Sequence, residues 1–301
     1  MIRQILDELD AVERELALAQ GAQRVALAAR QAQLLECCRS LTAEEQVSLA
    51  RHPRRPKIGG YISALFTDFF EQRGDRSCRE DASVVCGIAL FHGIPVTVIG
   101  HRKGTNIEEN MAYNFGMPGP EGFRKARRAM QQAEKFGRPV ITFIDTPGAY
   151  PGLEAEERGQ GEAIARSIAQ MSRLRVPVVS IVTGEGNSGG ALAIGVANRV
   201  LMLENAYYAV LSPEGFASIL WKDPSRRGEA CDVMKLTAKD LYGFGVIDEI
   251  VPEPAGGAQR DPQALYRAVD DALIRALLQL RGMDAQALVA QRYERFRKIG
   301  N

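Results

Sequence analysis

Apolar residues follow two different spacings along the chain. From residue 2 to residue 16 they recur every three or four positions with charged residues between them, which predicts an amphipathic helix. Further along, short aliphatic and β-branched runs end at glycine-bearing turns, as expected of buried strands. This pattern predicts strands over residues 83–91, 95–100, 139–144, 176–182, 199–203, 207–211 and 246–251, and helices over residues 24–38, 61–72, 121–136, 156–171 and from 261 onwards. The alternation of the two element types predicts an α/β domain with largely parallel strand pairing.

Two turns carry the strongest local signal. In Val178–Ile194, VVSIVTGEGNSGGALAI, an apolar run meets a glycine cluster and then a good helix former, which predicts a strand, a tight turn and a helix N-terminus. The turn Asp145–Gly148 follows a second apolar run and precedes a second predicted helix. Free backbone N–H groups at such turns can bind an anion or stabilise an oxyanion. The alternative is that the glycines only permit tight packing and positive φ angles, and the presence of two such turns favours the oxyanion interpretation.

Prolines and capping residues divide the chain. Ser40 or Thr42 could cap a third helix, and Glu45 would complete a capping box after Thr42. Pro213 fits the first turn of a later helix. The segment Arg51–Pro56, RHPRRP, cannot continue a helix through its prolines. We therefore expect a helical leader over residues 1–50, a main domain over 51–262 and a helical tail over 263–301.

Composition removes several classes of function. The 301 residues carry a formal net charge of +1, so nothing indicates binding to nucleic acid or to an anionic membrane. No apolar run approaches the ~20 residues of a membrane span, and the amphipathic, acidic N-terminus is unlike a signal peptide. The five cysteines show no CxxC pattern, and none of the three histidines stands at metal-ligand spacing from a cysteine. We therefore expect reduced thiols in the cytoplasm and no metal site.

Two familiar motifs lack their partners. The segment Gly186–Gly190 matches the G-x-S-x-G turn of serine hydrolases, in which Ser188 would be the nucleophile. In α/β-hydrolases the histidine base follows the serine, whereas all three histidines here precede it, so we expect Ser188 to be a turn or helix-capping residue. The segment Asp145–Gly148 resembles the DxxG step of GTP-binding proteins, but the phosphate-binding G-x-x-x-x-G-K-[ST] motif does not occur.

A series of segments in fixed order carries a more specific resemblance. They are RHPRRP (51–56), LFTDFFEQRGDR (65–76), PVTVIGHRKG (95–104), NFGMPGPEGFRKA (114–126), ITFIDTPGAYPG (141–152), AEERGQGEAIA (155–165), GEGNSGGALAIGV (184–196), SPEGFASILWKD (212–223) and IDEIVPEPAGGAQRDP (247–262). Over these segments the chain resembles the α subunit of bacterial-type acetyl-CoA carboxylase carboxyltransferase. Many long motifs in one order are more specific than any single glycine-rich pattern.

The resemblance implies a crotonase-like (ClpP/crotonase) α/β fold, a superhelix of ββα units with a helical N-terminal leader and C-terminal helices. It implies an α₂β₂ heterotetramer in which a separate β subunit supplies zinc and part of the active site, while this chain binds no metal or cofactor itself. The implied reaction moves the carboxyl group of carboxybiotin, held on a biotin carboxyl carrier protein, to acetyl-CoA and gives malonyl-CoA for fatty-acid or specialised biosynthesis. Biotin carboxylase would belong to the wider complex.

In that family the glycine turn of the α subunit forms the oxyanion hole for the ureido oxygen of biotin. The resemblance therefore implies Gly189 and Gly190 as catalytic residues. It implies substrate-binding roles for Gly186, Asn187 and Ser188 at the same turn and for Gly148, Ala149, Tyr150 and Pro151 at the second turn.

The chain departs from the family pattern near both turns. Asn187 stands where a second glycine is usual, Glu154 stands where a glycine is usual, and Gly161 replaces a serine. If position 187 needs a positive φ, asparagine there would cost about 1 kcal/mol. Such changes suggest a specialised copy of the family.

Two alternatives to an active α subunit stay open. A self-sufficient crotonase-type acyl-CoA enzyme would need an acid–base carboxylate, for which Glu154, Glu185 and Glu214 are the candidates. A non-catalytic assembly subunit would result if Asn187 spoils the oxyanion hole.

Overall fold

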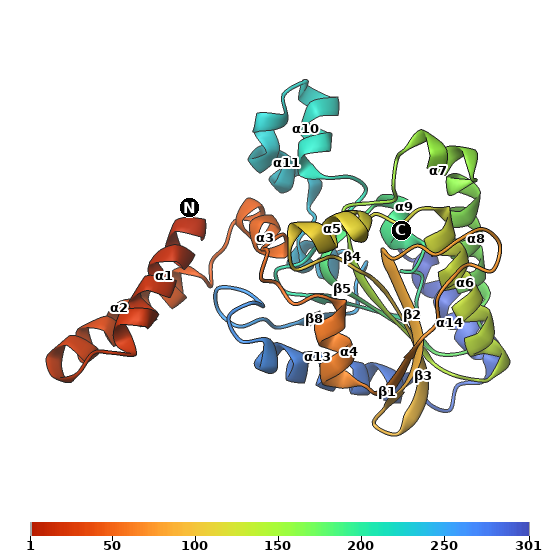
Figure 1. Cartoon of the computed structure of the whole chain (residues 1–301), viewed down its shortest axis with the longest axis horizontal. Helices are drawn as coiled ribbons and strands as arrows, with labels where there is room; N and C mark the ends of the chain where they lie inside the picture. The colour runs from red at the N-terminus through yellow and green to blue at the C-terminus, as the bar shows by residue number, and fades with distance from the viewer. Residues whose placement is uncertain (1, 301) are drawn as a thin grey trace.

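A mixed sheet of eight strands forms the centre of the computed structural model, which describes residues 2–300 (Figure 1). The strands are β1 (Thr67–Glu71), β2 (Val84–Phe91), β3 (Ile94–His101), β4 (Val140–Thr146), β5 (Val178–Asn187), β6 (Arg199–Leu203), β7 (Tyr207–Ala209) and β8 (Glu249–Val251). Their order is β1-β2-β3-β4-β5-β6-β8, and β7 pairs with the last three residues of β5. The β1–β2 and β2–β3 pairs are antiparallel and the others are parallel, so the predicted α/β domain with largely parallel pairing is confirmed.

Helices cover the sheet on both faces. They are α1 (Ile2–Leu16), α2 (Gly21–Cys37), α3 (Ala43–Ala50), α4 (Ile58–Leu65), α5 (Ile107–Ala112), α6 (Pro120–Lys135), α7 (Leu153–Glu157), α8 (Gln160–Arg173), α9 (Ser188–Leu192), α10 (Pro213–Trp221), α11 (Arg227–Met234), α12 (Ala238–Gly243), α13 (Pro262–Leu280) and α14 (Ala285–Arg297). In Figure 1, α6, α8 and α14 lie together on one side, and α4 and α13 lie together on the other. The α1–α2 hairpin and the α10–α11 pair project from this body.

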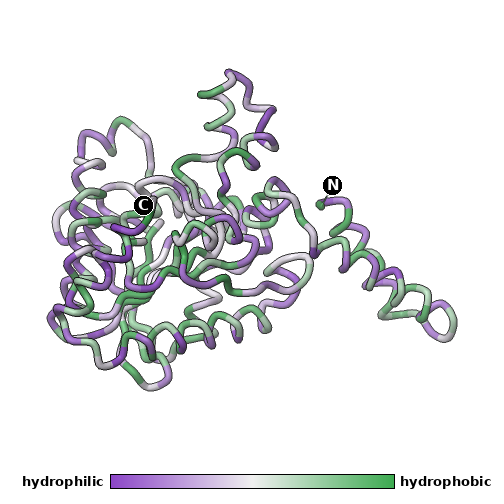
Figure 2. The backbone as a smooth tube through the Cα atoms, turned by 180° about the vertical axis from the view of Figure 1, so that it is seen from behind, coloured by the Kyte–Doolittle hydropathy of each residue, from purple (hydrophilic) through white to green (hydrophobic). Residues whose placement is uncertain are grey.

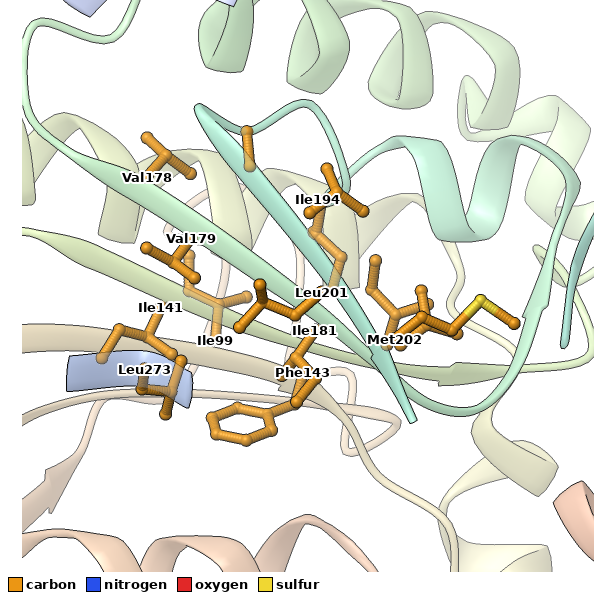
Figure 3. Packing of buried hydrophobic residues seen from close by; sticks show 14 of the residues in the cluster. Ile99, Ile141, Phe143, Val178, Val179, Ile181, Ile194, Leu201, Met202 and Leu273 are labelled. Carbon is orange, nitrogen blue, oxygen red and sulfur yellow. The ribbon is translucent and has the colours of Figure 1, made fainter. Parts of the chain in front are cut away.

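The core lies where the strands are buried on both faces. Every residue of β4 and β5 is buried, which is typical of central parallel strands covered by helices on both sides. Figure 2 shows hydrophobic positions in the middle of the body and a mixture of hydrophobic and hydrophilic positions along the outer helices. Figure 3 shows Leu273 of α13 in one cluster with Ile141 and Val179 of the sheet. Burying each such side chain stabilises the fold by about 1.5–3 kcal/mol. The central strands therefore fix the positions of the turns that follow β4 and β5.

The predicted leader is helical, as its apolar spacing indicates. The buried stripe of α1 packs against α2 and α3. The predicted capping box of Thr42 and Glu45 is confirmed at the start of α3. Asp10 of α1 pairs with Arg54 at 2.7 Å and also with Arg260, so ion pairs hold the hairpin to the rest of the chain. The expected divisions at residues 50 and 262 stay predictions, and their outermost residues, 1 and 301, lie outside the described part of the chain.

Three of the predicted elements need correction. The helix over residues 61–72 is wrong, because α4 ends at Leu65 and the aromatic segment after it forms the edge strand β1 on β2. The helix over residues 156–171 is interrupted, because Gly159 has a left-handed φ of +83° between α7 and α8. The strand predicted to end at residue 182 continues to Asn187, because its last residues pair with β7 and with Thr146.

Candidate functional site

The carboxyl ends of β3, β4 and β5 meet at one edge of the sheet, because these strands are parallel neighbours. The two glycine turns predicted from the sequence touch there. A Cβ atom on Gly190 would lie 2.6 Å from the backbone nitrogen of Ala149 and 2.7 Å from the carbonyl carbon of Gly148. Real Cβ atoms do not approach backbone so closely, so Gly190 is required by the contact between the turns.

The amides of Gly189 and Gly190 are available as donors. Both residues lie in the first turn of α9, where N–H groups have no acceptor within the helix. Among residues 2–300, no backbone acceptor outside the helix is assigned to either amide. Gly189 is also spatially restricted, since a Cβ there would lie 3.2 Å from the side chain of Ile164. The turn therefore holds two neighbouring N–H groups without a backbone acceptor outside the helix in the described part of the chain, with Gly189 half-buried and Gly190 buried.

The positive φ of this turn falls on Ser188 and not on Asn187. Asn187 has an extended φ of −114° and pairs with Ala209, whereas Ser188 has a φ of +57°. Position 187 therefore does not need a positive φ, and the conditional cost of asparagine there does not arise, because β5 runs one residue past Gly186 before the chain turns. Ser188 is exposed, and among residues 2–300 no hydrogen bond links its hydroxyl to a histidine. It is a turn residue, as the order of serine and histidines indicated.

The side chain of Asn187 belongs to a buried hydrogen-bond network. Asn187 is completely buried, and its Nδ2 donates to the hydroxyl of Tyr207 at 2.9 Å. That hydroxyl donates to Glu185 Oε2 at 2.6 Å and accepts from Arg51 Nη2 at 2.8 Å. Asn187, which departs from the family pattern and directly precedes the turn, therefore points its side chain into the protein and not towards a ligand at the turn.

A chain of ion pairs continues from this network, and sequence reasoning missed it. Lys103 Nζ lies 2.7 Å from Asp145 Oδ1 and 2.8 Å from Glu185 Oε1. Arg51 Nε lies 2.8 Å from Glu185 Oε2, and its Nη1 lies 2.7 Å from Glu214 Oε1. Arg51 and Lys103 stand in two of the segments that carry the family resemblance, but no spacing in the sequence indicates that they meet.

The ion pairs decide the protonation of the candidate carboxylates. Burial opposes ionisation of Glu185, but Lys103 and Arg51 outweigh it and lower the pKa of this carboxyl to about 2. Burial likewise opposes ionisation of Glu214, and Arg51 lowers its pKa below the usual range. The exposed Glu154 has a lowered pKa through hydrogen bonds from its own backbone and from Tyr150. All three are ionised and weakly basic near neutral pH, so none is poised as a general acid or base.

His101 lies beneath the same edge in a neutral form. It is completely buried, and this burial lowers its pKa to about 4. Its Nδ1 accepts a 3.4 Å hydrogen bond from the amide of Asp145. The histidine thus supports the end of β4 as an uncharged group and supplies no positive charge near neutral pH.

Of the four predicted residues of the second turn, the first two contact the first turn. Gly148 has a φ of +139°, and its amide donates to Thr146 Oγ1 at 3.0 Å. Gly148 and Ala149 contact the first turn, as described above. The backbone of Tyr150 donates to Pro118 and accepts from a glutamine side chain, and Pro151 is exposed. Tyr150 and Pro151 therefore lead towards α7.

A cavity of about 300 Å³ opens beside the second turn. Its lining includes Arg51, Lys57, Lys103, Phe115, Pro147 and Glu185. Pro147 directly precedes Gly148, whereas neither glycine of the first turn lines the cavity. A larger cavity of about 820 Å³ lies between α4, α13 and the β2–β3 turn and contains none of the predicted site residues.

Residues 2–300 contain neither a metal-ligand cluster nor a membrane-spanning helix. No group of three or more histidine, cysteine, aspartate or glutamate side chains is placed to hold a metal ion. In the same residues, every helix is too short or too polar to cross a membrane.

Comparison with known proteins adds to this geometry. Residues 1–300 match the sequence model of the acetyl co-enzyme A carboxylase carboxyltransferase-like family. The chain is 58% identical over 262 residues to acetyl-coenzyme A carboxylase carboxyl transferase subunit alpha of Anoxybacillus flavithermus, covering 87% of this chain and 81% of that protein. It is 55% identical over 261 residues to the protein of the same name from Listeria monocytogenes serotype 4b, covering 87% and 82%.

Solved structures share the fold at low sequence identity. A Pseudomonas malonate decarboxylase hetero-tetramer in complex with coenzyme A has a chain with a TM-score of 0.62 at 19% identity, covering 77% of this chain and 90% of that one. Transcarboxylase 12S gives a TM-score of 0.57 at 20% identity over 72% of this chain, and the match spans only 41% of that longer chain. The crotonase-like fold expected from the sequence is confirmed.

Proposed function

The chain belongs to the acetyl co-enzyme A carboxylase carboxyltransferase family, and from this premise we propose that it is the alpha subunit that transfers a carboxyl group from carboxybiotin to acetyl-CoA. The single observation that carries the chemical part of this proposal is the contact between the two glycine turns. This contact fixes the backbone at Gly190, next to Gly189, while the nearby carboxylates Glu185 and Glu214 are ionised and weakly basic.

Backbone donors suit the charge that this reaction develops. When the N–C bond of carboxybiotin breaks, carbon dioxide leaves and negative charge develops on the ureido group. Two N–H groups in a fixed turn stabilise that charge without reorganisation, and one such donor is worth about 10²–10³ in kcat. The ureido nitrogen then takes a proton from the methyl group of acetyl-CoA, and the resulting enolate attacks carbon dioxide to form malonyl-CoA. The proton ends on biotin, so this sequence needs no side-chain base.

We propose that other polypeptides complete the enzyme. The relatives are named as a subunit alpha, which supports a β subunit as partner in an α₂β₂ assembly, with any zinc on that subunit. A biotin carboxyl carrier protein would deliver carboxybiotin, and biotin carboxylase would belong to the wider complex. The proposed compartment is the cytoplasm, a location consistent with the five cysteines, which are free thiols in the structure.

Reconstitution tests the proposal. The full chain is mixed with a cognate β subunit, carboxylated biotin carrier and acetyl-CoA, and malonyl-CoA is measured by mass spectrometry. We expect product only when both subunits are present. Turnover of an acyl-CoA by the isolated chain would support a self-sufficient enzyme instead, and an assembled complex without product would support a non-catalytic subunit.

A further inference from the structure

Lys57 differs from the other cations around the 300 Å³ cavity because its ammonium has no partner. Arg51 and Lys103 also line this cavity, and both are paired with Glu185. Among residues 2–300, no hydrogen bond or ion pair is formed by the Lys57 ammonium. The cavity wall therefore carries one ammonium that is attracted by Asp145 and Glu185 through space but makes no hydrogen bond to a protein acceptor among the described residues.

The position of Lys57 connects this charge with the glycine turns. Lys57 directly precedes α4 and lines two adjoining spaces, the 300 Å³ cavity and a groove of about 700 Å³. The smaller cavity extends to Pro147, next to Gly148, and Gly148 contacts Gly190. An anion held by Lys57 would thus lie in the same cavity that borders the second glycine turn.

The surroundings of Lys57 favour an anion as its partner. Burial lowers the pKa of its ammonium, while Asp145 acts in the opposite direction and Lys103 in the same direction. A partly dehydrated ammonium without a hydrogen-bond acceptor is costly, and a bound anion that accepts its hydrogen bonds relieves that cost. The site is therefore arranged to gain from a negatively charged ligand.

We propose that Lys57 binds the carboxylate group that the enzyme transfers. This inference rests on the proposed function and names a binding residue for it. The carboxylate occurs in both carboxylated substrates, on the ureido nitrogen of biotin and at the end of the malonyl thioester, so the shared ligand chemistry is a single carboxylate.

Charge and size favour a carboxylate over the phosphates of coenzyme A. The other cations of the larger groove have acidic partners of their own, in the pairs Arg54–Asp10, Arg55–Glu253, Arg102–Glu71 and Lys103–Asp145. One unpaired cation matches one negative charge, whereas coenzyme A carries several on its phosphates. A cavity of about 300 Å³ lies at the lower end of the range for ligand sites, and it suits a small head group better than a nucleotide.

Kinetics of the reconstituted complex in both directions test this proposal. Lys57→Met removes the charge at similar length, and Lys57→Arg keeps it. Lys239→Met, at an exposed lysine on α12, is the matched control for the loss of one positive charge. We expect Lys57→Met to raise the KM of a carboxylated substrate at least tenfold, while the KM of acetyl-CoA changes less than twofold. Lys57→Arg should return within threefold of the unmodified enzyme.

The two directions distinguish the sources of the carboxylate. A raised KM for malonyl-CoA alone assigns Lys57 to the thioester carboxylate, and a raised KM for carboxybiotin alone assigns it to the biotin side. Increases in both show that the ammonium binds the carboxylate of either substrate, before and after the group crosses as carbon dioxide. Equal increases for malonyl-CoA and acetyl-CoA, or no change in any KM, would overturn the proposal. If Lys57→Met does not assemble, Lys57→Gln makes the same comparison, and an unmodified complex without activity would refute the proposed function instead.

Discussion

Replacing Tyr207 with phenylalanine removes a single oxygen atom from the network next to the glycine turn. The ring can remain in its buried place, so the change isolates the hydrogen bonds of the hydroxyl. Three groups lose a partner: Asn187 Nδ2 at 2.9 Å, Arg51 Nη2 at 2.8 Å and Glu185 Oε2 at 2.6 Å. These losses are unequal, because the three groups differ in burial and in the partners they retain.

Asn187 accounts for the largest part of the expected loss of unfolding free energy. It is completely buried, and its Oδ1 already has no partner among residues 2–300, so without Tyr207 the whole amide would be unpaired. That costs about 1–3 kcal/mol. Glu185 keeps Lys103 and Arg51, so its loss is about 1 kcal/mol. Arg51 keeps two carboxylates and is partly exposed, so it adds little. We expect Tyr207→Phe to lower the unfolding free energy by about 2–4 kcal/mol.

A double-mutant cycle with Asn187→Gly checks this reasoning. In the glycine background the amide is absent, so Tyr207→Phe should cost only about 1 kcal/mol, the share of Glu185. Urea unfolding of all four proteins gives the free energies. In the reconstituted complex, Tyr207→Phe should lower kcat at least tenfold with little change in the KM of acetyl-CoA, because small displacements of catalytic donors are costly. Equal destabilisation by Tyr207→Phe in both backgrounds would refute the role given to the Asn187–Tyr207 bond.

Three further changes test other parts of the site. Gly190→Ala should reduce carboxyl transfer at least 100-fold in an assembled complex, because the new methyl group would lie 2.6 Å from the backbone nitrogen of Ala149. Gly161→Ala is the control and should stay fully active, because its methyl group would have no atom within 4 Å. Equal losses of activity in the two variants would contradict this explanation. Ser188→Gly should keep kcat within about threefold. It should raise the unfolding free energy by about 1 kcal/mol, because glycine adopts a positive φ without strain. A loss of kcat above about 100-fold would instead indicate that the Ser188 hydroxyl is a nucleophile. Burial lowers the pKa of His101 from 6.5 to about 4. Below pH 6.5 the unfolded chain therefore binds a proton at this histidine that the folded chain does not. The unfolding free energy should fall by roughly 2 kcal/mol between pH 7 and pH 5. Urea titrations at both pH values measure this loss, and a His101→Gln variant with an unchanged slope would exclude the histidine as its source.

Much of the architecture could be predicted from local sequence alone. The strands β2 and β3, the helix α6 and the position of Pro213 in the first turn of α10 lie where spacing and turn residues predicted them. Such signals succeed because they depend on neighbours a few positions away. The prediction failed at residues 67–71, where aromatic residues are compatible with either element type. Pairing with β2 made this segment a strand, and such a contact lies outside any local window.

The glycine turns and their chemistry were determined by the sequence itself, because glycine clusters after apolar runs are local features. Only the tertiary structure decided that the two turns touch at Gly190 and that the positive φ falls on Ser188. It also decided the charges around them. Arg51 and Glu185 are 134 positions apart, and they meet because α3, which Arg51 directly follows, packs against β5 and β7 at the carboxyl edge of the sheet. Burial and the neighbouring cations at that edge together set the pKa values of its carboxylates. The fold also makes Asn187 a buried hydrogen-bond donor to Tyr207 in place of the turn residue that its sequence position suggested.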